Sequence, residues 1–310
     1  MKTMSEREFS LYRKLIYSNA GICLTPPKKA LLEARLGRRL RELGLESFLD
    51  YYQRVTTDPT GHELVQLLDR VTTNETHFFR EPRQFEFLEH VLLPDWRAQA
   101  EAGLRPRQLR VWSAGCATGE EPYSLAMTLL DHLPPARGWK LEIIGTDLSS
   151  RAVESAQKAI GPIAKAKEIP DKYLKRFMLK GTGEQKACMK AGPEIISIVR
   201  CQNLNLNAEH YPIPGIFDLI FCRNVMIYFD PQSRACVIDR VLRHLALTGY
   251  LFVGHAESLH GASAQLRHVI PTVYNQNSAP QSTANPPWQA GATTKRPAML
   301  VKRLAVSRPR

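Results

Sequence analysis

Beyond about residue 109, the chain alternates short apolar runs with segments of helical pattern. Continuous apolar runs of this length are typical of buried strands, and helical segments between them are typical of βαβ units in a parallel sheet. The sequence therefore predicts an α/β fold with a doubly wound, Rossmann-like sheet. Helices are expected after Glu120, Ser149 and Pro231. The expected strands are residues 109–112, 141–145, 195–200, 217–222 and 250–254.

Residues 1–90 have helical spacing of apolar residues and no convincing strand pattern, which predicts an all-helical N-terminal domain. One of its expected helices has leucines on one face and cations on the opposite face, with only Glu33 and Glu42 to balance them. These cations are Lys28, Lys29, Arg35, Arg38, Arg39 and Arg41. Two interpretations stay open, a solvated helix face and a docking surface for an acidic partner.

The remaining organisation follows from length and composition. A chain of 310 residues is long enough for about two domains. The change from the helical pattern to alternating strands and helices assigns residues 91–276 to the sheet domain. A glycine- and lysine-rich excursion at about 160–195 interrupts the alternation and predicts a small inserted β-subdomain. Residues 277–310 are rich in proline and carry six cations and no acid, so we expect a disordered basic tail. The tail can be a passive extension or a binding arm.

Charge and hydropathy bound the partners and the compartment. The 42 lysines and arginines exceed the 30 acids by 12, which suits an acidic protein, a nucleic acid or an anionic membrane surface. No stretch approaches the roughly 18 apolar residues that cross a bilayer, and the N-terminus leads into no apolar signal core. A cytoplasmic protein without a transmembrane segment is therefore expected. The six cysteines form no C-x-x-C pair, so no metal site is expected.

Residues 111–124 form a turn of small side chains between an expected strand and an expected helix. Small side chains let a ligand approach the backbone, and the first strand-to-helix crevice of a doubly wound sheet is where nucleotide-like ligands bind. The turn matches neither the dinucleotide nor the phosphate-loop pattern. Glu120 and Glu121 would repel a pyrophosphate and suit a ligand with a positive centre. A merely tight turn explains the pattern about as well.

Asp147 ends the next expected strand, about 30 residues beyond the first turn. A carboxylate at this position can accept hydrogen bonds from both hydroxyls of a ribose, or it can simply cap the following helix. Taken together, the two features indicate an adenosine that bears no phosphate. That description fits S-adenosylmethionine.

Two further polar clusters contain candidate site residues. Residues 217–230 run from a buried strand into Arg223, Asn224 and Tyr228, at the sheet edge where active sites are built. Residues 72–82 lie between the helical part and the sheet domain, a position that suits a site over which both parts close. Structural roles as caps, core aromatics or ion pairs are open for each of these residues.

These motifs resemble the chemotaxis receptor methyltransferases called CheR. The resemblance rests on residues 74–80, 118–124, 205–207 and 221–229 and runs from about Glu8 to Tyr274. It implies the class I S-adenosylmethionine-dependent methyltransferase fold. It also implies methyl transfer to glutamates in the cytoplasmic part of chemoreceptors, with glutamate methyl esters and S-adenosylhomocysteine as products. The cofactor contacts implied by the motifs are Asn74, Thr76, Arg80, Glu121, Asp147, Asn205, Leu206, Arg223 and Asn224.

The resemblance also bears on partners and catalysis. It favours receptor docking by Arg35, Arg38 and Arg39, and it implies that the inserted β-subdomain can bind a receptor's C-terminal peptide, as in some members. Because a glutamate is already ionised near neutral pH, the reaction needs no base and no metal. We expect Arg80 and Tyr228 to line the reacting centre.

Two alternative functions remain open. One is a cofactor-binding receptor adaptor without turnover. The other is a class I methyltransferase for another protein or a nucleic acid, although Val225-Met226-Ile227 stands where such amide-type loops usually carry prolines. We therefore expect no nucleic acid partner.

Overall fold

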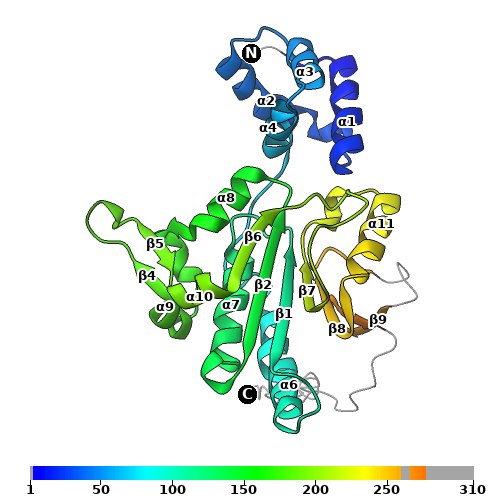
Figure 1. Cartoon of the computed structure of the whole chain (residues 1–310). Coiled ribbons are helices and arrows are strands. Elements are labelled where there is room, and N and C mark those ends of the chain that lie inside the picture. Colours follow the sequence, from blue (N-terminus) through cyan, green and yellow to red (C-terminus); the bar gives the residue numbers. More distant parts are fainter. Residues whose placement is uncertain (1–2, 260–265, 277–310) are drawn as a thin grey trace, which may run out of the picture. The chain divides into compact units, whose positions relative to one another are not determined.

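A seven-stranded sheet forms the centre of the computed structural model, which describes residues 3–259 and 266–276 (Figure 1). The strand order is β6-β2-β1-β7-β8-β10-β9. The pairs from β6 to β8 are parallel, and β10 runs antiparallel to both β8 and β9. The strands are β1 (Gln108–Ala114), β2 (Lys140–Asp147), β6 (Val199–Asn203), β7 (Phe217–Cys222), β8 (Leu245–Val253), β9 (Leu266–Ile270) and β10 (Val273–Gln276).

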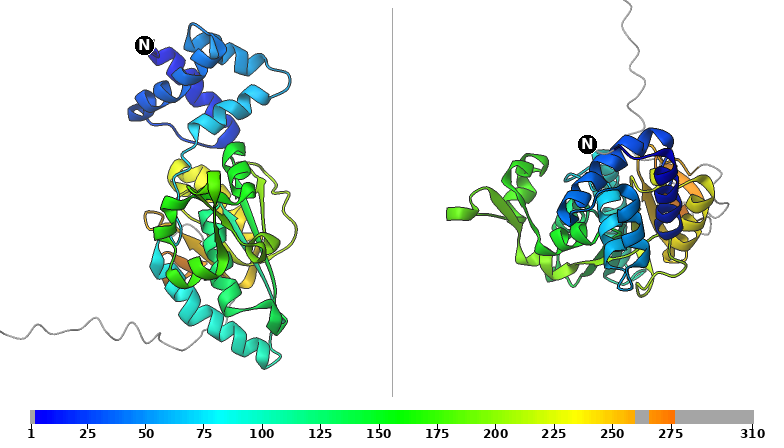
Figure 2. Two further views of the ribbon diagram at one scale, coloured as in Figure 1. Left: turned by 90° about the vertical axis from the view of Figure 1, so that its left-hand side faces the viewer. Right: turned by 90° about the horizontal axis from the view of Figure 1, so that it is seen from above.

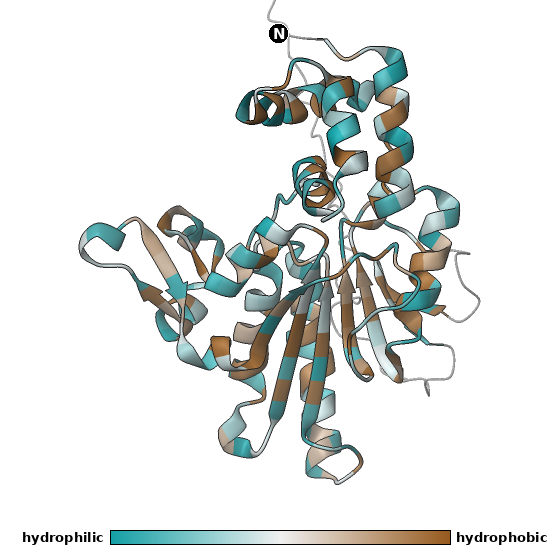
Figure 3. Ribbon diagram, turned by 45° about the horizontal axis from the view of Figure 1, so that its top comes forward, coloured by the Kyte–Doolittle hydropathy of each residue, from teal (hydrophilic) through white to brown (hydrophobic). Residues whose placement is uncertain are grey.

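The sheet is buried on both faces, as its continuous apolar strands predict. Val111, Ile143 and Leu219 point into one apolar cluster, and their neighbours Trp112 and Ile144 point into another on the opposite face. Figure 3 shows the resulting apolar bands along the strands. The helices of the sheet region are α5 (Pro82–Phe87), η2 (Leu88–Leu92), α6 (Leu93–Glu101), α7 (Glu120–His132), η3 (Pro135–Arg137), α8 (Ser150–Lys158), α10 (Pro193–Ile198), η6 (Met226–Tyr228) and α11 (Pro231–Leu242).

The predicted doubly wound fold is confirmed, with two corrections. Residues 195–198 belong to helix α10 rather than to the expected strand, because Pro193 occupies the first turn, where its fixed φ favours a helix. Only residues 199 and 200 of that prediction lie in β6. The antiparallel strands β9 and β10 were not expected, since short strands at a sheet end carry a weak apolar pattern.

The N-terminal part is all-helical and has its own apolar core. Its helices are α1 (Glu6–Ala20), η1 (Pro26–Lys28), α2 (Lys29–Leu43), α3 (Phe48–Thr57) and α4 (His62–Val71). Ser5 caps α1 through a reciprocal capping box with Glu8, and Ser47 caps α3 through one with Asp50. These helices lie over the carboxyl ends of the parallel strands (Figures 1 and 2).

A small antiparallel sheet lies beyond the β6 edge of the central sheet (Figures 1 and 2). Its strand order is β3-β5-β4, as expected for an inserted β-subdomain. Its elements are β3 (Ile160–Pro162), η4 (Ile163–Glu168), α9 (Asp171–Phe177), β4 (Met178–Lys180), η5 (Gly183–Gln185) and β5 (Cys188–Ala191). The expected tail, 277–310, falls outside the described residues. Within the described ranges, no helix is long and apolar enough to span a bilayer.

We predict that Glu63→Gln destabilises the helical part by about 2 kcal/mol near neutral pH. The buried Glu63 accepts two hydrogen bonds of 2.8 Å from Arg39, and these hold its pKa below the ordinary 4.5. A carboxylate with a lowered pKa stabilises the fold above its unfolded pKa and loses that contribution as the pH falls. Urea unfolding should therefore show the deficit of the variant shrinking below about pH 4.5. The exposed Glu86→Gln serves as control, and a pH-independent deficit would contradict the assignment.

Candidate functional site

A pocket lies where the helical part meets the carboxyl ends of the parallel strands. Its volume of about 230 Å³ is many times the space that one water molecule needs. The loops after β1, β2, β6 and β7 form its sheet side, and α2 with the linker after α4 forms the opposite side. The pocket is lined by all nine residues expected to contact the cofactor, namely Asn74, Thr76, Arg80, Glu121, Asp147, Asn205, Leu206, Arg223 and Asn224, and also by Tyr228 and Arg35.

The loop after β1 brings its backbone to the pocket wall. Gly115 has a φ of 89°, and a Cβ at this position would overlap the side chain of Val225. Ala117 follows with a φ of 47° and donates its N–H to Asp147 Oδ2 over 2.9 Å. A residue larger than glycine would thus displace the neighbouring loop, so glycine is needed at this position for the loop after β7 to pack against the turn.

Asp147 lies at the end of β2 and is not the cap of α8. The N-cap is Ser149, whose hydroxyl accepts from Ala152, while Asp147 accepts the N–H groups of Ser149 and Ala117. Burial raises the pKa of this carboxyl, although the two N–H groups oppose the rise. Asp147 therefore keeps acceptor capacity at the pocket wall instead of ending a helix.

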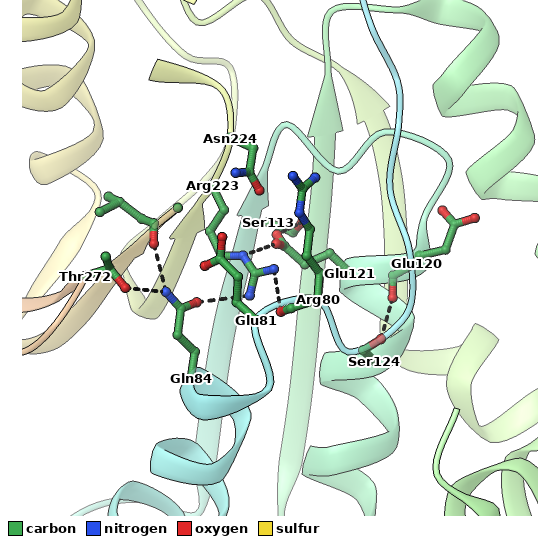
Figure 4. A network of polar contacts seen from close by, with 12 residues as sticks. Arg80, Glu81, Gln84, Ser113, Glu120, Glu121, Ser124, Arg223, Asn224 and Thr272 are labelled. Atoms are coloured by element: carbon green, nitrogen blue, oxygen red, sulfur yellow. Dashed lines mark hydrogen bonds and ion pairs between the residues drawn. The ribbon is translucent and has the colours of Figure 1, made fainter. Parts of the chain in front are cut away.

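Arg223 lies beneath the pocket floor, with its side chain only 1% exposed (Figure 4). Its Nε lies 3.0 Å from Glu121 Oε2, and its two terminal nitrogens donate to Gln84 Oε1 at 3.0 Å and to the Arg80 carbonyl at 2.6 Å. Glu121 also accepts from the Ser113 hydroxyl at 2.7 Å. Burial raises the pKa of Glu121, and Arg223 opposes that rise. The guanidinium therefore also holds neighbouring pocket-lining groups in place, in addition to the part of Arg223 that lines the pocket.

The two neighbouring acids of α7 have separate roles. Glu121 lines the pocket, whereas Glu120 turns away and pairs with Lys165 of the inserted subdomain. Of the two acids that the sequence offered to a positive ligand, only Glu121 is therefore placed at the pocket.

Glu257 is a site residue that sequence reasoning missed. Its buried carboxylate accepts from the backbone N–H groups of Gly254 at 2.7 Å, Asn224 at 2.6 Å and Ile227 at 3.2 Å. Asn224 has a φ of 57°, so this carboxylate helps to fix a strained loop that leads to Tyr228. No local pattern marks Glu257, because two of its three partners, Asn224 and Ile227, lie about 30 residues away along the chain.

The rim of the pocket carries cations from the helical part. Lys28 Nζ lies 5.4 Å from the centre of the Tyr228 ring, and Arg35 donates to the Val71 carbonyl and to the Thr73 hydroxyl. Burial lowers the pKa of Arg35. Tyr228 is itself tied to the helical part, because its carbonyl accepts from the N–H of Cys23 at 2.8 Å. Both parts of the chain thus build this rim.

The three arginines expected to dock a partner have different surroundings. Arg35 lines the pocket, and Arg39 is held by Glu63 and Glu42 with its side chain 16% exposed. Arg38 is 80% exposed and lies 3.4 Å from Glu42. Of these three, only Arg38 is directed largely to solvent.

Comparison with known proteins identifies relatives of the whole described fold. Residues 74–274 match the family model described as CheR methyltransferase, SAM binding domain, and residues 7–72 match its all-alpha domain. The chemotaxis protein methyltransferase of Borreliella burgdorferi is 36% identical over 88% of this chain and 95% of its own. That of Escherichia coli is 38% identical over 87% and 91%, and that of Salmonella typhimurium is 36% identical over 87% and 90%.

We predict that Arg223→Met destabilises the protein by about 3 kcal/mol at neutral pH, because it leaves Glu121 buried without its counter-charge. A raised carboxyl pKa lowers stability as the pH rises above the unfolded value, so the deficit should be larger near pH 8 than near pH 5. Thermal unfolding of the double variant Glu121→Gln/Arg223→Met should show a smaller deficit with less pH dependence. Equal deficits in the single and double variants would refute the charge argument.

Proposed function

The chain belongs to the CheR methyltransferase family, and from that premise we propose that it methylates glutamate side chains in the cytoplasmic part of chemoreceptors. The products would be glutamate methyl esters and S-adenosylhomocysteine, and the protein would work in the cytoplasm. The observation that carries the proposal is one pocket that gathers all nine expected cofactor contacts, Arg80 among them, with Tyr228.

The residues of the pocket fit S-adenosylmethionine. Gly115, where a Cβ would overlap the Val225 side chain, lets the loop after β7 pack against the turn after β1 and so shapes the pocket wall. Asp147 would accept from the ribose hydroxyls, and Glu121 would face the positively charged part of the cofactor. The remaining contacts would come from Asn74, Thr76, Arg80, Asn205, Leu206, Arg223 and Asn224.

The bound cofactor supplies an electrophilic methyl group on a sulfonium. The residues of this chain have to position an ionised glutamate and exclude water, since a carboxylate of pKa about 4.3 needs no general base. Arg80 would hold the carboxylate or the cofactor, and Tyr228 would orient the substrate at the rim. Neither role requires a proton to move.

Receptor recognition is assigned to the helical part and to the inserted subdomain. Arg38 would meet the acidic methylation region directly, while Arg35 would act at the pocket rim and Arg39 would support the basic face through its pairing. The inserted β-subdomain would offer a second contact, for a receptor's C-terminal peptide. Two contacts on one chain would raise the effective concentration of the methylation region at the pocket.

The proposal predicts base-labile labelling of receptors. Incubation of the protein and radiolabelled S-adenosylmethionine with membranes that contain chemoreceptors should label the receptor band. Mild alkali should release the label as volatile methanol, because carboxyl methyl esters hydrolyse in base. Base-stable label would instead indicate N-methylation. Binding of the cofactor without labelling would favour an adaptor without turnover.

The proposal also predicts how the two rim residues affect kinetics. Arg80→Met should lower kcat/KM roughly 100-fold, because misplacing the reacting groups is costly. Tyr228→Phe should lower kcat about tenfold and change cofactor affinity little, because its ring is retained. Arg83→Met, at an exposed position close by in the chain, is the matched control. Unchanged turnover and affinity in both variants would remove these residues from the reacting centre.

A further inference from the structure

The linker between the helical part and the sheet region has a strained backbone. Phe79 and Glu81 are not glycines, yet their φ values are 52° and 60°. Such conformations persist only where surrounding contacts hold them. Arg80 lies between these two residues, and Asn74 and Thr76 precede them on the same pocket-lining segment. The backbone conformation of this linker therefore depends on contacts made by residues outside it.

Side chains from three other parts of the chain form hydrogen bonds with four backbone groups of the linker. Two of these hydrogen bonds come from η4 of the inserted subdomain. Lys165 Nζ donates to the Thr76 carbonyl at 3.1 Å, and Glu168 Oε2 accepts from the Phe78 N–H at 3.0 Å. In the other two, the Ser124 hydroxyl accepts from the Phe79 N–H at 2.9 Å, and Arg223 donates to the Arg80 carbonyl. Half of these four hydrogen bonds thus come from side chains of the inserted subdomain.

Lys165 also reaches the loop after β1. Its ammonium pairs with Glu120, whose side chain is 8% exposed and also accepts from the Thr118 hydroxyl at 2.6 Å. A pair with this much burial is screened less by salt than a surface pair. One ammonium therefore joins the linker to the first turn of α7, where Glu121 faces the pocket.

The inserted subdomain makes a third contact with the linker through α9. The Tyr173 ring stacks on the Phe79 ring, with centroids 5.4 Å apart and planes within 4°. The Tyr173 hydroxyl donates to Glu89 Oε1 at 2.6 Å, which fixes the ring against η2. The stacking holds one of the two strained residues directly.

We propose that Lys165 is a positioning residue of the cofactor site, through which the inserted subdomain helps to set cofactor affinity. Lys165 does not line the pocket, so it acts through Thr76 and Glu120. The inference rests on the proposed function only in taking S-adenosylmethionine and its product as the ligands. Because coupling is reciprocal, cofactor binding should in turn stabilise η4.

The test compares Lys165→Met with two matched variants of the full chain. Calorimetry should show S-adenosylhomocysteine binding about tenfold weaker in Lys165→Met, as expected for the loss of a charge-assisted hydrogen bond. Lys165→Arg, which keeps the charge, should recover part of the affinity. Lys167→Met, at an exposed position on the same helix, should bind within about twofold of the unchanged protein. With receptor membranes, the KM for the cofactor should rise while kcat at saturation stays close to normal.

Hydrogen exchange gives a readout that a merely structural role would not move. Product binding should slow exchange of the amides in residues 163–168 of the unchanged protein and have less effect in Lys165→Met. If that variant folds poorly, Glu168→Ala replaces it and should weaken binding in the same direction.

The outcomes separate this inference from the proposed function. Normal affinity in Lys165→Met, or an equal loss in Lys167→Met, would overturn the positioning role even if receptors are methylated. Weaker binding only in Lys165→Met would support it even if receptors are not the substrate. Failure of the unchanged protein to bind the product would overturn both.

Discussion

The buried guanidinium of Arg223 is the contact on which the shape of the pocket most depends. Burying a charge is costly unless it is paired, and here the guanidinium forms an ion pair with the Glu121 carboxylate and donates hydrogen bonds to the Gln84 amide oxygen and the Arg80 carbonyl. Gln84 in turn donates to the Val253 carbonyl and to the Thr272 hydroxyl. A single residue directly after β7 thereby connects the linker, α7 and, through Gln84, the antiparallel end of the sheet.

Backbone strain marks the same region. Among the described residues, six that are not glycine have a positive φ, and four of these lie in the loops around the pocket: Phe79, Glu81, Ala117 and Asn224. Each conformation costs free energy and persists because neighbouring groups fix it, as Asp147 fixes Ala117 and Glu257 fixes Asn224. Such strain is typical of sites where a ligand must meet preorganised groups. The strain therefore locates the site independently of any motif.

Much of the site could be predicted because parallel topology gathers residues that are distant in sequence. Asp147 ends β2, Asn205 and Arg223 follow β6 and β7, and the carboxyl ends of such parallel strands meet at one edge. Glu257 and Lys165 could not be predicted, because their partners are fixed only by tertiary packing. The same limit applies to Arg39, which looks like a surface cation on a basic helix face until Glu63 of α4 is packed against it. Local pattern also failed at residues 195–198, where a proline starts a helix within an apolar run.

The distribution of charge around the pocket connects its geometry to the proposed reaction. Its sheet side supplies the acids Glu121 and Asp147 together with Arg223, which pairs with Glu121, and its helical side supplies the cations Lys28 and Arg35. The linker adds Glu75 and Arg80 to the lining. A ligand with a positive centre is favoured against the sheet, and a carboxylate is favoured at the rim beneath the helices. Methyl transfer from a sulfonium to a glutamate requires these two charges in that order. Because the reaction neutralises both, the ionic attractions that favour the reactants are lost in the ester and the thioether, which assists release of the methylated side chain.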